Sequence, residues 1–165
     1  IVSVAAFCSQ RWRAAELSSP LETGSDRTWV VALSGMLVGQ LALGAILRHT
    51  GKGVMPHLAV AAVVATLAFV CGTRAWSQHQ DRPPLARLGS FLMVVTSLQL
   101  ILGFAALVAS GARAPGQPPT VADVLFTTLH QTNGALMLAG TGLLTVWTFR
   151  LVAAPQPAKA VQRPA

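Results

Sequence analysis

Charged side chains are scarce in this chain. Of its 165 residues only 10% are Asp, Glu, Lys or Arg, whereas 53% are hydrophobic. A water-soluble domain carries charge on about a quarter of its residues, so this sequence lacks the groups that would cover a surface facing water. Its apolar residues also come in long blocks and not in the period of a half-buried helix or strand. Both features exclude an ordinary soluble domain and indicate that lipid is the solvent.

Cysteine and acidic residues are scarce as well. The two cysteines, Cys8 and Cys71, lie in or beside apolar runs, so we expect no structural disulfide and predict that Cys71 is a small core residue. Five acidic residues against 12 basic ones give a net charge of +7. The basic residues stand singly at the ends of apolar blocks and form no stripe that would follow a phosphate backbone, which excludes nucleic acid as a partner.

Four stretches without charge predict the fold. They cover residues 29–47, 58–73, 88–112 and 124–149. A helix needs about 20 apolar residues to cross hydrocarbon, and the second stretch reaches this length when it is extended to Pro56, His57 and Trp76. Because lipid offers no partner to open backbone groups, each span must be a helix. We therefore predict an all-α integral membrane four-helix bundle over residues 29–152.

The segments outside the bundle have their own composition. Residues 1–8 are apolar but lack the basic leading region of a signal peptide. We interpret them as the end of a preceding transmembrane helix, which makes the chain a fragment of a longer protein. Residues 9–28 are expected to form a cytoplasmic loop. Residues 153–165, rich in Pro, Ala and Gln, are expected to be a disordered cytoplasmic tail.

The basic residues predict how the bundle is oriented. Cytoplasmic loops of membrane proteins carry an excess of Lys and Arg. Here nine basic residues fall on one side of the predicted spans, namely Arg11, Arg13, Arg27, Arg74, Arg82, Arg87, Arg150, Lys159 and Arg163, and three fall on the other, namely Arg48, Lys52 and Arg113. The first side is therefore predicted to be cytoplasmic.

A short motif occurs twice in the spans. Gln40-Leu-Ala-Leu-Gly44 in the first span recurs as Gln99-Leu-Ile-Leu-Gly103 in the third. Each copy lies in an outward-going helix that is followed by an outer loop and then by a helix with a histidine near its outer end. The simplest architecture is a helical hairpin used twice, related by a pseudo-two-fold axis along the membrane normal.

His57 and His130 occupy corresponding helices of these two hairpins. An ionisable group in a transmembrane helix is costly and usually faces the bundle interior. Two imidazoles facing each other across a bundle are a natural axial pair for heme iron, and Gly44 and Gly103 would widen the cavity. A closed zinc site would need four ligands, and no Cys, Asp or Glu lies nearby. The alternative is a pair of histidines that only hydrogen-bond between helices.

The depth of the two histidines must match if they share one iron. A helix from Val121 to Val152 would be about 48 Å long, which exceeds a hydrocarbon core of about 30 Å. Its first turns can therefore project outside, with Thr120 as N-cap and Asp123 in the first turn. This places His130 near the outer boundary, level with His57.

Other residues compete with these assignments or complete them. His49 is the rival of His57, which we prefer because Pro56 defines a helix start. His79 is interpreted as a solvated loop residue. Arg48 on the outer side is a candidate partner for the anionic heme propionates, and an interfacial arginine that extends toward water is an equal alternative.

These residues resemble a known family. Three segments resemble the carboxy-terminal half of the heme A synthases, which are membrane enzymes of cytochrome oxidase assembly. The segments are Gln40-Leu-Ala-Leu-Gly-Ala-Ile-Leu-Arg-His-Thr-Gly51, Pro56-His57 and Leu129-His130-Gln131. The resemblance covers most of residues 1–150, and the Arg-His-Thr-Gly element with the following Pro-His is its most specific part. The outer loop before His57 is short and lacks cysteine, in which it departs from some members.

The resemblance implies a function. In that family, eight helices form two similar halves, each with a histidine pair, and heme O is oxidised to heme A by conversion of a methyl to a formyl group. The carboxy-terminal half resembles a heme b site that relays electrons, and His57 and His130 match its two ligands. No glutamate lies in any span, so no catalytic residue is assigned.

The resemblance also implies partners and a location. Heme O and heme A would be substrate and product of the full enzyme, with an electron donor, heme O synthase and cytochrome oxidase assembly factors as partners. The location would be a bacterial inner (plasma) membrane, or the mitochondrial inner membrane in a eukaryote. Two alternatives remain open, a stand-alone bis-histidine cytochrome for electron transfer and a heme-free membrane scaffold or transporter.

Overall fold

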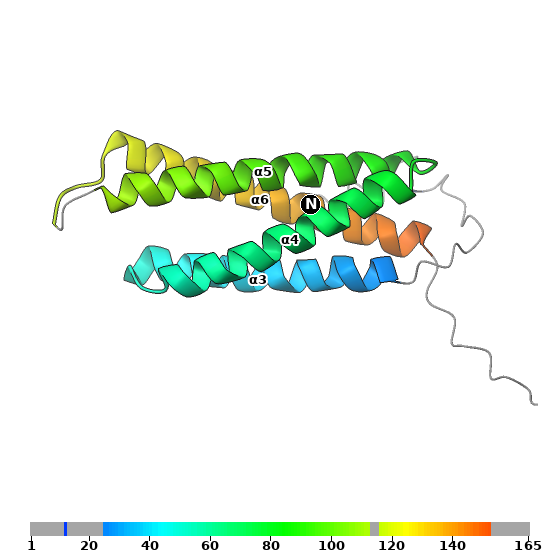
Figure 1. The fold of residues 1–165 in the computed structure, drawn as a ribbon, viewed down its shortest axis with the longest axis horizontal. Helices are drawn as coiled ribbons and strands as arrows, with labels where there is room; N and C mark the ends of the chain where they lie inside the picture. Colours follow the sequence, from blue (N-terminus) through cyan, green and yellow to red (C-terminus); the bar gives the residue numbers. More distant parts are fainter. Residues whose placement is uncertain (1–11, 13–24, 113–115, 153–165) are drawn as a thin grey trace, which may run out of the picture.

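The computed structural model describes residues 12, 25–112 and 116–152, and within these ranges the chain forms four long helices. They are α3 (Ser25–Thr50), α4 (Val54–Gln78), α5 (Pro83–Gly111) and α6 (Val121–Leu151). Helices that follow one another in the chain pack together, and α6 packs back on α3, so the bundle closes (Figure 1). All four are long and apolar enough to cross a membrane. The chain is thus a multi-pass membrane protein with an all-α four-helix bundle, as predicted.

Three predictions concern residues outside the described part of the chain. They are the end of a preceding helix at residues 1–8, the part of the cytoplasmic loop before residue 25 (except residue 12), and the tail at residues 153–165. At the start of the bundle, α3 begins at Ser25, four residues before the charge-free stretch from which it was predicted. Its first turn therefore includes Asp26, a side chain that the sequence pattern had assigned to a loop.

The helix ends follow elementary capping rules. α6 begins as expected, because the Thr120 hydroxyl accepts a hydrogen bond of 3.2 Å from the backbone N–H of Asp123. α5 begins with two prolines, at positions where a missing N–H removes no intrahelical bond. α4 begins at Val54, two residues before Pro56. Gly51 and Gly53 have φ values of 67° and 92° in the turn before it, a region that favours glycine.

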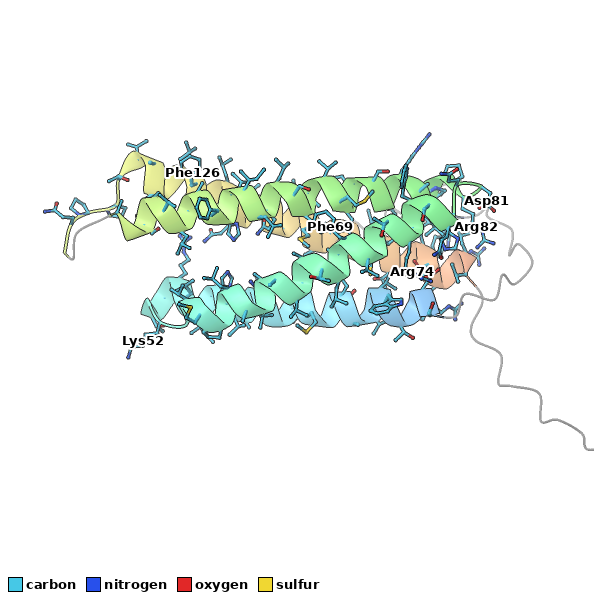
Figure 2. The ribbon with its side chains drawn as sticks, in the orientation of Figure 1. Lys52, Phe69, Arg74, Asp81, Arg82 and Phe126 are labelled. Atoms are coloured by element: carbon cyan, nitrogen blue, oxygen red, sulfur yellow. The ribbon has the colours of Figure 1, made fainter. Side chains whose placement is uncertain are left out.

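The two ends of the bundle carry different side chains. We call one the arginine end, after Arg27, Arg74, Arg82, Arg87 and Arg150, and the other the histidine end, after His57 and His130. Figure 2 shows Arg74, Arg82 and Asp81 at the arginine end and Lys52 at the opposite end. The basic residues of the described chain thus divide between the ends as the sequence predicted.

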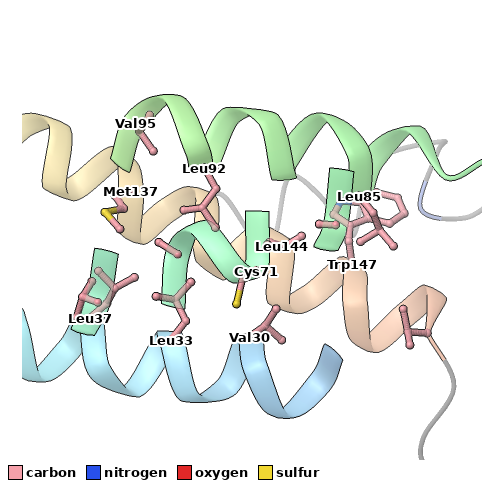
Figure 3. Close-up of a cluster of buried hydrophobic side chains, with 14 of the residues drawn as sticks. Val30, Leu33, Leu37, Cys71, Leu85, Leu92, Val95, Met137, Leu144 and Trp147 are labelled. Atoms are coloured by element: carbon pink, nitrogen blue, oxygen red, sulfur yellow. The ribbon is translucent and has the colours of Figure 1, made fainter. Parts of the chain in front are cut away.

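The apolar core lies in the half of the bundle toward the arginine end. Its fully buried large side chains are Leu33, Leu85, Leu92 and Leu144, and the buried Cys71 lies among them as predicted (Figure 3). In the direction of the histidine end, the last buried residue of α3 is Leu37, that of α4 is Val64 and that of α5 is Thr96. In α6, Asp123 is the single residue before Asn133 that is buried.

The course of α4 explains this uneven core. In Figure 1, α4 crosses the bundle obliquely, from the side of α3 at the histidine end to the side of α5 at the arginine end. The α3–α4 hairpin and the α5–α6 hairpin therefore come together at the arginine end and diverge toward the histidine end. Among the described residues, the interior of the histidine end is not closed by an apolar core.

Two arginines bind the carboxyl end of α6. Arg27 donates from Nε to the carbonyl of Val152 at 2.9 Å and from Nη2 to that of Phe149 at 3.1 Å. Arg82, which is buried, donates from Nη1 to the carbonyl of Leu151. The last carbonyls of a helix lack intrahelical partners and attract cations. These contacts join α6 to the start of α3 and to the α4–α5 turn.

A buried ionic cluster joins α3 to α4 at the same end. Arg74 contacts Asp26 Oδ1 with Nε at 2.7 Å and Nη2 at 2.6 Å, and His79 Nε2 lies 2.9 Å from Asp26 Oδ2. His79 is 3% exposed, so the prediction of a solvated loop histidine was wrong. Because α4 continues to Gln78, the next residue is its C-cap and lies against the first turn of α3.

We expect Asp26→Ala to lower the free energy of unfolding by about 3 kcal/mol, because it leaves the buried His79 and the partly buried Arg74 without their anion. The control is Asp81→Ala, since the Asp81 side chain is 66% exposed and its contact with Arg82 spans 3.6 Å. That substitution should change stability by less than about 1 kcal/mol. Reversible unfolding in detergent micelles measures both, and equal stabilities would contradict a structural function for the cluster.

Candidate functional site

His57 lies in the first turns of α4, half-buried against α3. The amide nitrogen Nε2 of Gln40 lies 3.2 Å from its Nδ1, 3.3 Å from its Nε2 and 3.1 Å from its backbone carbonyl oxygen. Gly44, one turn further along α3, faces the same ring, and a Cβ on it would lie 3.4 Å from His57 Cε1. Residues four apart share a helix face, so the pair Gln40 and Gly44 forms the surface on which the imidazole rests.

His130 lies in α6 and makes the corresponding contacts with α5. Gln99 Nε2 is 3.3 Å from His130 Nε2. A Cβ on Gly103 would lie 2.9 Å from Cε1 and 3.2 Å from Nδ1 of the same ring. The first of these distances is shorter than real Cβ contacts, so the ring occupies space that only glycine leaves free.

The sequence repeat is therefore a repeat of contacts. In both hairpins, the glutamine and the glycine of the five-residue motif touch the histidine of the next helix. The glycines were expected to widen a cavity, whereas in the structure they make room for the imidazoles themselves. This agreement of motif and contact supports the two-hairpin architecture more strongly than the five-residue match alone.

Both imidazoles lie toward the same end of the bundle, where the apolar core is absent. They come from different hairpins, and both are half-buried. Two buried polar atoms beside them, Nδ1 of His130 and Oε1 of Gln40, have no hydrogen-bond partner. Buried polar atoms without a partner are rare and costly, and in a native structure they call for an explanation.

The other candidate residues lie apart from this pair. Arg48 and His49 are exposed in the last turn of α3, at the histidine end. His79 belongs to the ionic cluster at the opposite end. Among the described residues, no three His, Cys, Asp or Glu side chains gather where a metal ion would bind. The donor set at the histidine end is therefore a pair of imidazoles with amide neighbours.

Sequence reasoning overlooked the glutamines and Asn133 as members of this site. Asn133 is buried, and its Nδ2 donates to the Gln99 Oε1 and to the Val95 carbonyl, both at 2.8 Å. A signal was present, because Gln40 and Gln99 open the two motif copies and are polar side chains in otherwise apolar runs. In hydrocarbon such a side chain needs a partner, and the repeated histidine was the obvious choice.

Comparisons of the chain with protein-family models, with curated proteins and with solved structures find no match. The functional argument therefore depends on the site and on the motifs of the sequence.

Gly103→Ala is expected to displace the His130 ring, because the added Cβ would lie 2.9 Å from it. The control is Gly39→Ala on α3, where nothing lies within 4 Å of an added Cβ. The control should be neutral or stabilising by up to about 1 kcal/mol, as expected for alanine in a helix, and Gly103→Ala should lack this gain. Unfolding in micelles and ¹⁵N NMR of the histidines test this, and an unchanged His130 signal would refute the close packing.

Proposed function

We propose that His57 and His130 bind heme b as its two axial ligands, and that the chain acts as the carboxy-terminal half of a heme A synthase. The observation that carries the proposal is the pair of repeat-related imidazoles toward one end of the bundle, each backed by a glutamine and a glycine. The choice of the synthase depends on the resemblance of the motifs around Gln40–Gly51, Pro56-His57 and Leu129–Gln131.

The residues at the histidine end fit a heme. Bis-histidine ligation needs two imidazoles from different helices of a bundle. His57 on α4 and His130 on α6 are the two histidines proposed for this function, and no group of three metal-binding side chains lies among the described residues. A porphyrin is flat and largely apolar, and it needs interior space that side chains do not fill. Beyond Leu37, Val64 and Thr96 the described helices α3, α4 and α5 have no buried residues toward the histidine end, and the proposal requires the porphyrin to lie in this part of the bundle. The buried, unpartnered Nδ1 of His130 is consistent with a missing ligand.

Each residue has a defined part in this proposal. A bound heme supplies an iron that accepts and gives up one electron. His57 and His130 would hold this iron through one ring nitrogen each. Arg48, exposed at the histidine end, is placed to pair with an anionic group at the wet edge of the bundle.

This chain is proposed to bind and relay, and it is assigned no catalytic residue. The two carboxylates within the described helices are both engaged in other contacts, since Asp26 bonds to Arg74 and His79, and Asp123 accepts from the Ser110 hydroxyl at 2.6 Å. Conversion of heme O to heme A, and contacts with an electron donor or with cytochrome oxidase assembly factors, belong to the proposed full oxidoreductase. With its arginine end in the cytoplasm, the chain would lie in a bacterial inner membrane.

His57→Ala and His130→Ala should each abolish the low-spin bis-histidine absorption spectrum of the purified chain loaded with heme b, because each removes one axial ligand. Two controls are available in the same chain. His49→Ala tests the rival ligand, and His79→Ala tests a histidine of the arginine end. Both controls should retain the spectrum. If His49→Ala loses the spectrum and His57→Ala retains it, His49 and not His57 is the axial ligand. A wild-type chain that takes up no heme would favour the heme-free scaffold or transporter.

Arg48→Gln is expected to weaken heme b binding about tenfold, the value of one hydrogen bond to a charged group. Titration of the chain with heme b, and with a heme whose propionates are esterified, measures this. The substitution should weaken binding of heme b and leave binding of the ester unchanged. Equal affinities for heme b in wild type and variant would mean that Arg48 only extends toward interfacial water.

The gene separates the synthase from a stand-alone cytochrome. If the encoded sequence before Ile1 adds four helices with a second histidine pair, the synthase is favoured. A start codon directly before Ile1 would favour an electron-transfer cytochrome that uses the same two ligands.

A further inference from the structure

The α3–α4 hairpin has contacts between its helices at both ends. At the arginine end, Arg74 donates from Nε to Asp26 Oδ1 at 2.7 Å. Toward the histidine end, Gln40 donates from Nε2 to the backbone carbonyl of His57 at 3.1 Å. The two helices are therefore joined along their length and form one unit.

The α5–α6 hairpin is joined along its length in the same way. Near the turn between its helices, the Ser110 hydroxyl donates to Asp123 Oδ1 at 2.6 Å. Further toward the arginine end, the Phe91 ring packs on Gly140, where an added Cβ would lie 2.6 Å from Cε1 of the ring. A ring that fills the space above a glycine opposes sliding of one helix along the other. This hairpin is therefore a second unit.

Hydrogen bonds between the two hairpins lie toward the arginine end. Arg27 on α3 donates to the carbonyls of Phe149 and Val152 at the end of α6. The hydroxyl oxygens of Ser34 and Thr145 lie 3.1 Å apart and join the same two helices. These residues belong to the beginning of α3 and the end of α6, so they connect the two units on one side of the bundle only.

On the other side, the backbones of α4 and α5 touch at a pair of buried glycines. A Cβ on Gly89 would lie 2.5 Å from the carbonyl oxygen of Gly72 and 2.7 Å from the backbone nitrogen of Trp76. A Cβ on Gly72 would lie 3.0 Å from the carbonyl oxygen of Gly89 and 2.7 Å from Met93 Cγ. Small residues allow transmembrane helices to approach this closely. The closest contact is thus between backbones, and neither glycine has a side chain that would oppose a change in the crossing angle.

We propose that the Gly72–Gly89 contact is a pivot, about which the two hairpins open and close at the histidine end. Beyond this contact, the hairpins diverge toward the histidine end (Figure 1). From Gly72 to Met55, α4 extends for roughly 25 Å at about 1.5 Å per residue. A rotation of about 10° at the contact would therefore move the end of α4 by about 4 Å. Hinge closure around a ligand takes this form.

The link to a ligand rests on the function proposed above. A ligand that bonds to one side chain of each hairpin would hold the two units together at the histidine end. Heme b bound by His57 of the first hairpin and His130 of the second would be such a ligand. The pivot itself belongs to the ligand-free chain and is testable without heme.

The first test measures distances between spin labels by double electron–electron resonance in lipid nanodiscs. Met55→Cys and Val124→Cys, both at exposed positions, label the two hairpins at the histidine end. Thr28→Cys and Arg87→Cys, also exposed, label them at the arginine end. With the two native cysteines removed, we expect a broad distribution for the first pair and a narrow one for the second. A distribution as narrow at the histidine end would mean one rigid body and would overturn the pivot.

The second test alters the contact itself. Gly89→Ala should separate α4 from α5 and shift the Met55–Val124 distance by about 4 Å, whereas Gly142→Ala is the control, because nothing lies within 4 Å of an added Cβ there. Gly72→Ala, whose nearest neighbour is the flexible Met93 side chain, should give a smaller shift and keeps the test valid if Gly89→Ala does not fold. Unchanged distances in the folded glycine variants would overturn the pivot.

The third test adds heme b to the labelled chain. The distances at the histidine end should become shorter and more uniform, and those at the arginine end should stay the same. Heme that binds with a bis-histidine spectrum but leaves the first distances unchanged would overturn the pivot while the heme function stands. A wild type that binds no heme, with glycine variants that still shift the distances, would overturn the heme function and support the pivot.

Discussion

A polar group in hydrocarbon has no water to bond with, so it must find its partner inside the protein. The same need for a partner applies to any buried polar group, including those at the arginine end. The carboxyl end of α6 obtains its partners from Arg27 and Arg82, and Asp26 obtains its own from Arg74 and His79. Within the spans, Gln40 and Gln99 bond to the two histidines. The arginines that orient the chain and the amides that back the histidines therefore meet the same requirement at opposite ends of the bundle.

The two ends of the bundle pair their polar groups but differ in how their apolar side chains pack. At the arginine end, the polar contacts surround an apolar core in which Leu33, Leu92 and Leu144 are fully buried. At the histidine end, the hairpins diverge (Figure 1), and His57 and His130 are half-buried. An interior without a core gains little from the burial of apolar surface, and such incomplete packing suits a site that takes up a large, flat ligand. The fold thus separates the part that holds the helices together from the part proposed to bind heme.

The sequence predicted the framework because the membrane imposes it. Four charge-free runs predicted the four helices, and Thr120 predicted the start of α6 as its N-cap. The uneven distribution of the basic residues predicted the two different ends of the bundle. Cys71 was also predicted correctly as a core residue. These features depend on local composition and on lipid, and both can be read from neighbouring residues.

The errors arose where partners are distant in the chain. His79 was predicted to be solvated because its neighbours are polar, yet Asp26, 53 positions away, removes it from water. The glutamine contacts required knowledge of which helix faces meet, and a hydropathy pattern does not contain it. The assignment of His57, His130 and Arg48 to heme b remains a proposal, since the binding of a cofactor is not encoded in the hydropathy pattern.

The contacts of each histidine lie within its own hairpin. Gln40 and Gly44 reach His57 across α3 and α4, while Gln99 and Gly103 reach His130 across α5 and α6. Transmembrane hairpins that form early during synthesis would consequently carry their imidazoles already paired with an amide, before the second half of the bundle exists. Assembly then joins two hairpins in which each histidine already has an amide neighbour on the adjacent helix.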